Sequence, residues 1–310
     1  MATLETLRRR VEGVQDMHGV VRAMKSLSAV RIRQCRQAAE ALTAYADTVE
    51  LGLRAALRAR PPAVRTAREA PAGDVLLVAF GSDQGLVGGY NARIAEAALA
   101  RGRQFAQPMV VVGNRLAHLL DASGVSILAR FSSPRSPDAL TPVVNALLLS
   151  LDERRTSHGV SRWELCYTHQ VPGAGTRPQC VPLEPLDQAT SEALARQPWP
   201  TNNLPSFRGS WEGLLAAIMR ERLRVALSQA LLAALTNEHL SRLAAMQAAE
   251  ERIETRLVEL GRDYREQTQQ AITEELQEIT AGFRALRRRR RPVPRHAGRA
   301  DAPGEPGGRK

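Results

Sequence analysis

The sequence is poor in aromatic residues, and its C-terminal part has a long stretch without proline. Phe, Trp and Tyr make up 4% of the chain, although large globular cores usually bury many aromatic rings. No proline occurs between Phe207 and Arg291. Because proline is the residue that most strongly interrupts a helix, its absence permits one helix of about 80 residues. We therefore expect long helices rather than one large compact core.

Cysteine is also scarce, and long apolar runs are missing. The three cysteines, Cys35, Cys166 and Cys180, are scattered and have no CxxC spacing, which is typical of a reduced, cytosolic compartment. The N-terminus has no apolar signal core, and no apolar run reaches the ~20 residues that a membrane-spanning helix requires. If the chain works at a membrane, we expect another subunit to hold it there.

Sequence motifs for nucleotide binding, metal binding and catalysis are absent as well. Ser82–Gly89 is rich in glycine, but it has neither a GxxxxGK motif nor the GxGxxG pattern of phosphate-binding loops. Tight packing of small residues between a strand and a helix is the structural interpretation, and a ligand site is the alternative. The six histidines show neither HExxH nor an HxxxH pair. We expect no cofactor, no metal and no catalytic residue in this chain.

The positive charge is concentrated at the C-terminus. The formal net charge is +11, and residues 287–310 contribute nine Lys or Arg against two acidic residues. Arg287–Arg291 precede a segment rich in Gly and Pro, so residues 292–310 are predicted to be a disordered basic tail. Binding of nucleic acid or acidic lipid is the alternative interpretation of this charge.

Periodicity and helix breakers divide the rest of the chain into four segments. Residues 1–57 repeat apolar side chains at intervals of three and four, which predicts an N-terminal helix. Residues 58–73 form a linker rich in helix breakers. Residues 74–205 alternate short apolar runs with helical patterns, which predicts a Rossmann-like α/β domain with a mostly parallel sheet. Residues 206–291 are predicted to form the long C-terminal helix.

Short apolar runs and turn residues place the elements of the α/β domain. Strands are expected at Val75–Phe80, Met109–Val112, Val125–Arg130 and Trp163–His169, and helices near Asn91–Arg101, Asn114–Ala122 and Pro137–Arg154. Glycines at positions 173 and 175 predict a hairpin at the edge of the sheet.

An apolar seam runs along the C-terminal helix, with one gap at Thr268. Its members are spaced by three and four: Ile253, Leu257, Leu260, Tyr264, Ile272, Leu276, Ile279, Phe283 and Leu286. The two terminal helices can bury their apolar stripes against each other, which predicts an antiparallel coiled coil with the α/β domain inserted between them. A seam period near 3.5 residues predicts a left-handed supercoil.

Three blocks of sequence resemble the gamma subunit of F-type ATP synthases, the central rotor shaft of those enzymes. They occur in the family's order and together cover nearly all of residues 1–286. The blocks comprise Val14–Gln15, Arg22–Lys25 and Ala29–Arg33; then Ser82–Asn91; and finally Glu238–Leu243, Ala245–Met246, Gln269, Ala271–Leu276, Glu278–Ile279 and Ala281–Gly282.

The resemblance implies a central rotor stalk that couples ion-driven rotation of a membrane ring to ATP synthesis or hydrolysis. Its partners would be the alpha and beta subunits of the catalytic hexamer, the epsilon subunit and the membrane c-ring. The chain itself would be non-catalytic and would bind neither nucleotide nor nucleic acid. It would be a peripheral subunit at the cytoplasmic face of the bacterial inner membrane. The coupling ion, proton or sodium, would be bound by other subunits.

The resemblance also implies a collar of residues that faces an acidic loop of the beta subunits. These residues would be Arg22, Met24, Lys25 and Arg242, and the charged ones would steer the loop rather than bind it tightly. Spacing leaves another interpretation open, because Arg242 lies four residues after Glu238 and could form a local ion pair.

Two further contacts are implied closer to the C-terminus. Gln269 and Thr273 would meet a beta-subunit loop during rotation, although a solvated stripe on one helical face is the simpler interpretation of their spacing. The apolar seam of the shaft would be formed by Ile272, Leu276, Ile279 and Phe283.

Several positions depart from the family's pattern. Gln84, Val87 and Thr268 stand where the family usually has Arg, Cys and Arg, and the family usually ends near Leu286. These departures indicate a divergent lineage, such as the N-type ATPases. Two other functions stay open from the residues alone: a nucleic-acid-binding coiled coil that uses Arg287–Arg291, and an enzyme built on the Rossmann-like domain.

Because the chain has no lysine-containing phosphate loop, we expect the isolated protein neither to bind nor to hydrolyse ATP. Titration calorimetry with Mg-ATP should give no binding heat, whereas an isolated P-loop subunit serves as the positive control. Stoichiometric binding of ATP to this chain would contradict the prediction.

Overall fold

The computed structural model describes residues 4–60, 75–105, 109–157, 162–171, 173, 175–183, 188–203 and 205–289. Helices α1 and α6 are the longest elements, and the others lie between them in the chain. In order, the elements are α1 (Leu4–Arg58), β1 (Val75–Phe80), α2 (Tyr90–Phe105), β2 (Met109–Val112), α3 (Asn114–Ala122), β3 (Ile127–Phe131), η1 (Pro137–Ala139), α4 (Leu140–Ser157), β4 (Arg162–Val171), β5 (Gly175–Leu183), α5 (Gln188–Arg196) and α6 (Trp211–Arg289).

The chain divides into two compact units. The larger unit spans Met17–Arg252, and the smaller unit combines the start of α1, up to Asp16, with the part of α6 from Ile253 onward. Both long helices therefore contribute to both units. No helix among the described residues is long and apolar enough to cross a membrane.

A five-stranded mixed sheet lies in the larger unit, with the strand order β3-β2-β1-β4-β5. Strands β1 to β4 pair in parallel, and β5 pairs with β4 in the antiparallel direction. The predicted strands Val75–Phe80 and Met109–Val112 are confirmed at their predicted bounds. The predicted edge hairpin is confirmed too, since Val171 of β4 lies opposite Gly175 of β5.

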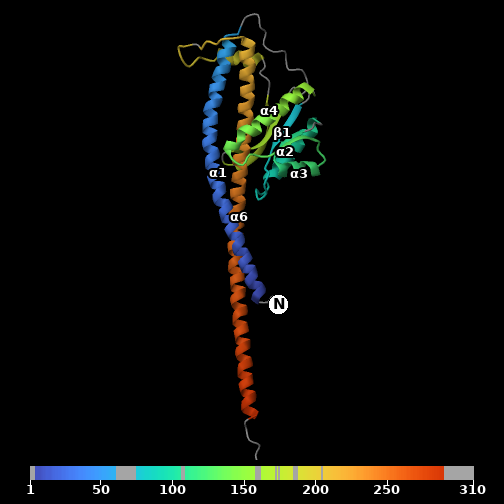
Figure 1. Ribbon diagram of the computed structural model, residues 1–310, viewed down its shortest axis with the longest axis vertical. Helices are drawn as coiled ribbons and strands as arrows, with labels where there is room; N and C mark the ends of the chain where they lie inside the picture. The colour runs from blue at the N-terminus through green and yellow to red at the C-terminus, as the bar shows by residue number, and fades with distance from the viewer. Residues whose placement is uncertain are drawn as a thin grey trace, which may run out of the picture. The chain divides into compact units, whose positions relative to one another are not determined.

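The two faces of the sheet are covered by different helices. Leu76, Val78 and Phe80 of β1 belong to a core that also contains residues of α1, α4 and α6. Leu77 and Ala79 point to the opposite core, which α2 and α3 complete. Figure 1 shows this layering, with α4 beside the two long helices and α2 and α3 beyond the sheet. Because both faces are buried, β1 is apolar at every position.

Within the larger unit, α1 and α6 run in opposite directions. Lys25 pairs with Glu250, Tyr45 Oη donates to Glu221 Oε1 at 2.9 Å, and Trp211 Nε1 donates to the carbonyl oxygen of Ala56 at 2.7 Å. The partner's number falls as the position along α1 rises, which is the signature of antiparallel pairing.

Buried positions along α1 repeat with a period of 3.5 residues. Each of the following positions, spaced alternately by three and four, is buried or half-buried: His18, Val21, Lys25, Ser28, Ile32, Cys35, Ala39, Leu42, Ala46, Val49, Leu53 and Ala56. This spacing is the heptad pattern of helices that pack along their length. His18 belongs to this buried face, whereas the neighbouring Met17 is exposed.

The smaller unit has little buried surface. Leu7 of α1 and Leu260 of α6 are its buried apolar residues among those described. Its polar surface carries ion pairs one helical turn apart, such as Arg9 with Glu5 and Arg262 with Glu266. Exposed pairs of this kind contribute little stability, about 0.3–0.5 kcal/mol each. The unit therefore depends on a narrow line of apolar contacts.

Other expectations differ from the structure in detail. The C-terminal helix begins at Trp211 rather than at residue 206, and α5 was not predicted. Strand β3 begins two residues later than expected, at Ile127. Most of the predicted linker and all of the predicted tail, 292–310, lie outside the described residues. The predicted domain boundaries stay a prediction.

The close approach of the β1 and β2 ends generates a stability prediction. Gly113 has a φ of 106°, and a Cβ atom there would lie 2.6 Å from the carbonyl carbon of Gly81. We expect Gly113→Ala to combine backbone strain with a steric clash and to destabilise the chain by about 2–5 kcal/mol. Gly124→Ala is the matched control, because Gly124 also has positive φ but has open space around it. Equal denaturation midpoints for the two variants would contradict the packing described here.

Candidate functional site

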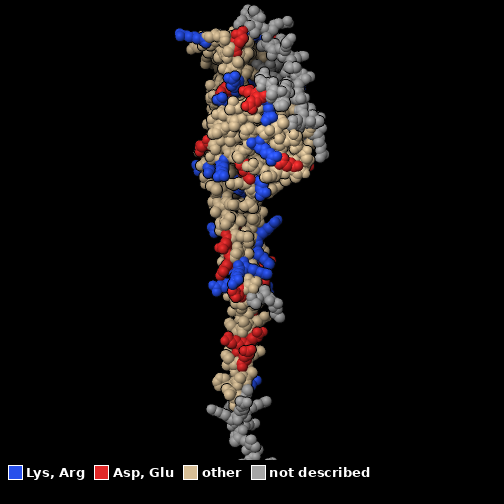
Figure 2. Space-filling model, turned by 45° about the vertical axis from the view of Figure 1, so that its right-hand side comes forward, with Lys and Arg blue, Asp and Glu red and all other residues tan. Residues whose placement is uncertain are grey.

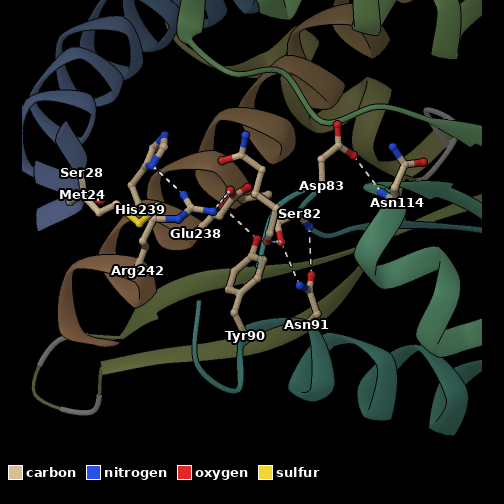
Figure 3. A network of polar contacts seen from close by, with 12 residues as sticks. Met24, Ser28, Ser82, Asp83, Tyr90, Asn91, Asn114, Glu238, His239 and Arg242 are labelled. Atoms are coloured by element: carbon tan, nitrogen blue, oxygen red, sulfur yellow. Dashed lines mark hydrogen bonds and ion pairs between the residues drawn. The ribbon is translucent and has the colours of Figure 1, made fainter. Parts of the chain in front are cut away.

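The loop after β1 is held by its own polar groups. The Ser82 amide donates to Asn91 Oδ1 at 3.0 Å, and Asn91 Nδ2 donates to Ser82 Oγ at 2.8 Å. The Asn114 amide, at the start of α3, donates to Asp83 Oδ1 at 2.8 Å. Figure 3 shows these contacts side by side. The polar side chains of Ser82, Asp83 and Asn91 therefore stabilise the turn and the start of α3.

Small residues allow close packing at only part of this loop. A Cβ atom at Gly81 would lie 2.4 Å from Leu116 Cβ, whereas one at Gly89 would meet nothing within 4 Å. Leu86 and Gly88 both have positive φ, which gives the loop its turn conformation. The tight packing expected for Ser82–Gly89 is thus found just before that segment, at Gly81.

Two buried hydrogen bonds fasten α6 to the sheet region. The fully buried Tyr90 donates its hydroxyl to the carbonyl oxygen of Ala234 at 2.9 Å. Asn237 Nδ2 donates to the carbonyl oxygen of Thr168, in β4, at 2.9 Å. Burial raises the pKa of Tyr90, so its hydroxyl remains a hydrogen-bond donor. Both bonds reach backbone carbonyls, which fixes the position of this helix turn against the sheet.

The next turn of α6 contains a buried charged cluster. Arg242 Nη2 donates to Glu238 Oε1 at 2.7 Å, and Arg242 Nη1 lies 3.2 Å from His239 Nδ1 (Figure 3). Burial raises the pKa of Glu238, while Arg242 opposes that shift. Burial and then Arg242 lower the pKa of His239 to about 4. His239 is therefore neutral near pH 7, and its Nδ1 accepts a hydrogen bond from Arg242 Nη1.

A cleft of about 580 Å³ lies beside this cluster. Its walls come from α1, the loop after β1, the segment after β3 and α6, and its basic lining residues are Arg31, Arg115, Arg135 and Arg242. A second cleft, of about 370 Å³, is lined mainly by apolar side chains of α1, α6 and the segment before α6. Neither cleft contains a recognised nucleotide or metal motif.

The four residues of the predicted collar occupy different environments. Arg22 is exposed, and Met24 lines the larger cleft. Lys25 forms an ion pair with Glu250. The hydrogen bond from Lys25 is the main reason that the pKa of the Glu250 carboxyl group is lowered. Arg242 is buried and pairs with Glu238, which is the local interpretation that the spacing left open. The structure does not bring the three cations together as one exposed surface.

Glu250 is a contact residue that the sequence alone did not identify. It lies 225 positions from Lys25, so only the register of the two helices brings them together. The sequence around Glu250 contains no pattern that indicates which residue of the facing helix lies opposite it.

The predicted contact residues near the C-terminus are exposed. Gln269 and Thr273 both face solvent, and the Thr273 hydroxyl donates to the Gln269 carbonyl oxygen at 2.8 Å. This bond satisfies the Thr273 donor within its own helix and leaves the Gln269 amide available.

The four residues of the predicted shaft seam are all exposed. Ile272, Leu276, Ile279 and Phe283 have exposed fractions of 52%, 60%, 53% and 73%. None of the described residues covers them. Figure 2 shows acidic side chains gathered on the same part of α6, where Glu274, Glu275 and Glu278 are exposed. Exposed apolar stripes of this kind are typical of interaction surfaces.

Comparison with known proteins gives consistent results over nearly the whole chain. A family model described as ATP synthase matches residues 3–286. The ATP synthase gamma chain of Synechococcus sp. (strain PCC 6716) is 27% identical, with 93% of this chain and 100% of the relative aligned. The gamma chain of Granulibacter bethesdensis is also 27% identical, with 92% and 100% aligned.

Solved structures show the same fold. A chain in the Euglena gracilis mitochondrial ATP synthase (OSCP/F1/c-ring) aligns with a TM-score of 0.61 and 14% identity, covering 96% of this chain and 99% of the other. A chain in the Tetrahymena thermophila mitochondrial ATP synthase central stalk and c-ring aligns with a TM-score of 0.52 and 18% identity, covering 74% and 99%.

The buried histidine generates a pH prediction. The unfolded chain protonates His239 near pH 6.5 and the folded chain only near pH 4. The neutral histidine therefore contributes stability that is complete above pH 6.5 and is lost as the pH falls toward 4, by up to about 3 kcal/mol.

We expect His239→Gln to flatten this part of the stability profile, measured by denaturant unfolding between pH 4 and pH 7. The exposed His118, changed to Gln, is the control and should leave the slope as in the wild type. An unchanged slope in His239→Gln would show that the histidine is not held neutral.

Proposed function

The chain belongs to the ATP synthase gamma-chain family, and we infer from this membership that it is the central stalk of a rotary ATP synthase. In this role it couples ion-driven rotation of a membrane c-ring to ATP synthesis or hydrolysis in the alpha and beta subunits. One observation carries the inference: gamma chains align along their full length with this chain, and the aligned part extends from the N-terminal helix to the exposed seam. The nucleic-acid alternative finds no support among these relatives.

The architecture needed for a stalk is supported by the helix register. We propose that α1 and α6 form an antiparallel, left-handed coiled coil. The 3.5-residue period of buried positions in α1 supports the handedness, since an undistorted helix has 3.6 residues per turn and must supercoil to keep such a seam in contact. The parallel order β3-β2-β1-β4 supports a Rossmann-like inserted domain, with residues 74–205 as its proposed extent.

The exposed seam is proposed to be the surface that turns inside the catalytic hexamer. An apolar stripe gives contact without directional hydrogen bonds, so it can slide from one subunit to the next without breaking a strong anchor. Gln269, with its free side-chain amide, and Thr273 flank Ile272, the first residue of this stripe, and would meet a beta-subunit loop. The acidic residues around the stripe would set its orientation by repulsion and attraction.

Two of the proposed collar residues are less available to a partner in this structure than the exposed seam residues are. Arg22 is exposed and can meet an acidic loop directly. Lys25 and Arg242 already have the carboxylates of Glu250 and Glu238 as partners, so either contact with a beta subunit would require exchange of one carboxylate for another. For the half-exposed Lys25 such an exchange costs little net energy, which suits a contact that must form and break at every step. For the buried Arg242 it would leave the Glu238 carboxylate without a partner, at a cost of several kcal/mol, so this contact is the less favourable of the two.

Torque must pass between the inserted domain and the long helices. The hydrogen bonds from Tyr90 to Ala234 and from Asn237 to Thr168 are proposed to fix the domain to α6 for this purpose. The chain itself would hold no nucleotide, and its rotation would favour a different conformation in each beta subunit in turn. We propose that it is peripheral at the cytoplasmic face of the bacterial inner membrane, held there through the epsilon subunit and the c-ring.

A single substitution tests the seam. Leu276→Asp places a charge at an exposed position of the free chain, so its helical content and denaturation midpoint should change little. In the assembled complex the same charge would be buried without a partner, at a cost of several kcal/mol. We expect the yield of complex with alpha and beta subunits to fall by about tenfold or more.

Gln277→Asp is the matched control, because it adds the same charge at the next position, outside the seam. It should assemble like the wild type. Equal yields of complex for Leu276→Asp and Gln277→Asp would show that the exposed seam is not the surface that contacts the hexamer.

A further inference from the structure

Two of the three cysteines face each other across the hairpin at the edge of the sheet. Cys166 of β4 lies directly opposite Cys180 of β5 in the antiparallel register. Directly opposed residues in such a ladder have Cα atoms about 4.5–5.5 Å apart, and disulfides form across Cα separations of about 4.4–6.8 Å. The backbone therefore already has the spacing that a disulfide requires.

The side chains lie on the same face and touch. Cys166 is a buried member of the core beneath α2 and α3, and Cys180 packs against that core while keeping partial exposure. A hydrogen bond links the two thiol groups. Cys35 belongs to the core on the opposite face of the sheet, so it cannot exchange with this pair without unfolding.

The surrounding charges distinguish the two sulfur atoms. The hydrogen bond from Cys166 lowers the pKa of Cys180, burial and then Glu164 oppose that shift, and Arg101 adds a smaller lowering effect. The same hydrogen bond and burial raise the pKa of Cys166. Arg101 is fixed beside the pair, because Nε and Nη2 each donate to a Glu164 carboxylate oxygen at 2.6 Å. Of the two thiols, Cys180 is therefore the one that ionises more easily, and Cys166 is the one that keeps its proton more firmly.

We propose that Cys166 and Cys180 form a redox-active dithiol that a hydroperoxide oxidises to a disulfide in the folded protein. The Cys180 thiolate attacks the terminal oxygen of the hydroperoxide, and the O–O bond breaks. Cys180 becomes a sulfenic acid, while the departing oxygen takes a proton and leaves as an alcohol, or as water from hydrogen peroxide.

The second step closes the disulfide. The Cys166 sulfur attacks the Cys180 sulfur, the S–S bond forms and the S–O bond breaks. The hydroxyl group leaves as water with the proton of Cys166. Two electrons have then moved from the two sulfur atoms to the peroxide oxygens, and a dithiol reductant can return them. The product ties edge strand β5 to β4.

The test uses the full chain at neutral pH with hydrogen peroxide as the oxidant. After native oxidation, unfolding and alkylation, mass spectrometry should show the loss of two hydrogen atoms and a peptide that links Cys166 to Cys180. Cys35 should be recovered as the alkylated thiol. Hydrogen exchange of β5 amides should slow on oxidation and recover after reduction.

Variants separate the two roles. Cys166→Ser should leave a sulfenic acid at Cys180 that a dimedone probe traps. Cys180→Ser should react with the peroxide at about one tenth of the wild-type rate or below. Arg101→Gln should slow the first step, whereas Arg101→Lys should restore part of the rate. Cys35→Ser is the control and should form the disulfide at the wild-type rate.

Equal oxidation rates for all three cysteines would overturn the proposal, as would a disulfide that forms only in denaturant. Circular dichroism checks that each variant is folded before its rate is compared. Because these measurements need neither partner subunits nor ATP, their outcome is independent of whether the chain acts as a rotor stalk.

Discussion

The pairing of two helices along one seam is the constraint on which the rest of the structure depends. Long isolated helices are marginal in water, so α1 and α6 depend on tertiary packing of their apolar faces. A period of 3.5 residues keeps the buried positions of α1 on one face from His18 to Ala56. The sheet then has a fixed surface to pack against, since Cys35 of α1 and Leu227 and Leu231 of α6 share a core with β1.

The same constraint explains why one part of α6 is stable yet unpaired. Helix α1 begins at Leu4, and apolar side chains of α6 from Ile272 onward are exposed. Evolution of a protein that worked alone would favour polar residues there, because the apolar groups gain nothing from water. Their exposure in this chain agrees with the proposed contact between this part of α6 and partner subunits. The hydrogen bonds from Tyr90 to Ala234 and from Asn237 to Thr168 hold another part of α6 against the sheet.

Much of this fold could be predicted from local sequence, and the exceptions have physical reasons. The strands Val75–Phe80 and Met109–Val112 were identified because buried parallel strands are apolar at every position. The Lys25–Glu250 and Tyr90–Ala234 contacts join distant segments, and their register is set by packing that no local pattern contains. The sequence left Arg242 with two interpretations, a local pair with Glu238 or contact with a beta-subunit loop, and in the structure the buried Arg242 pairs with Glu238.

Rotation is the central claim, and a single-molecule measurement tests it most directly. A hexamer of alpha and beta subunits would be fixed to a surface with this chain inserted and a probe attached to the inserted domain. We expect Mg-ATP to drive rotation of the probe in one direction, and we expect rotation to stop when ATP is exhausted. A complex that hydrolyses ATP at the normal rate while the probe stays fixed, or only fluctuates without direction, would contradict it.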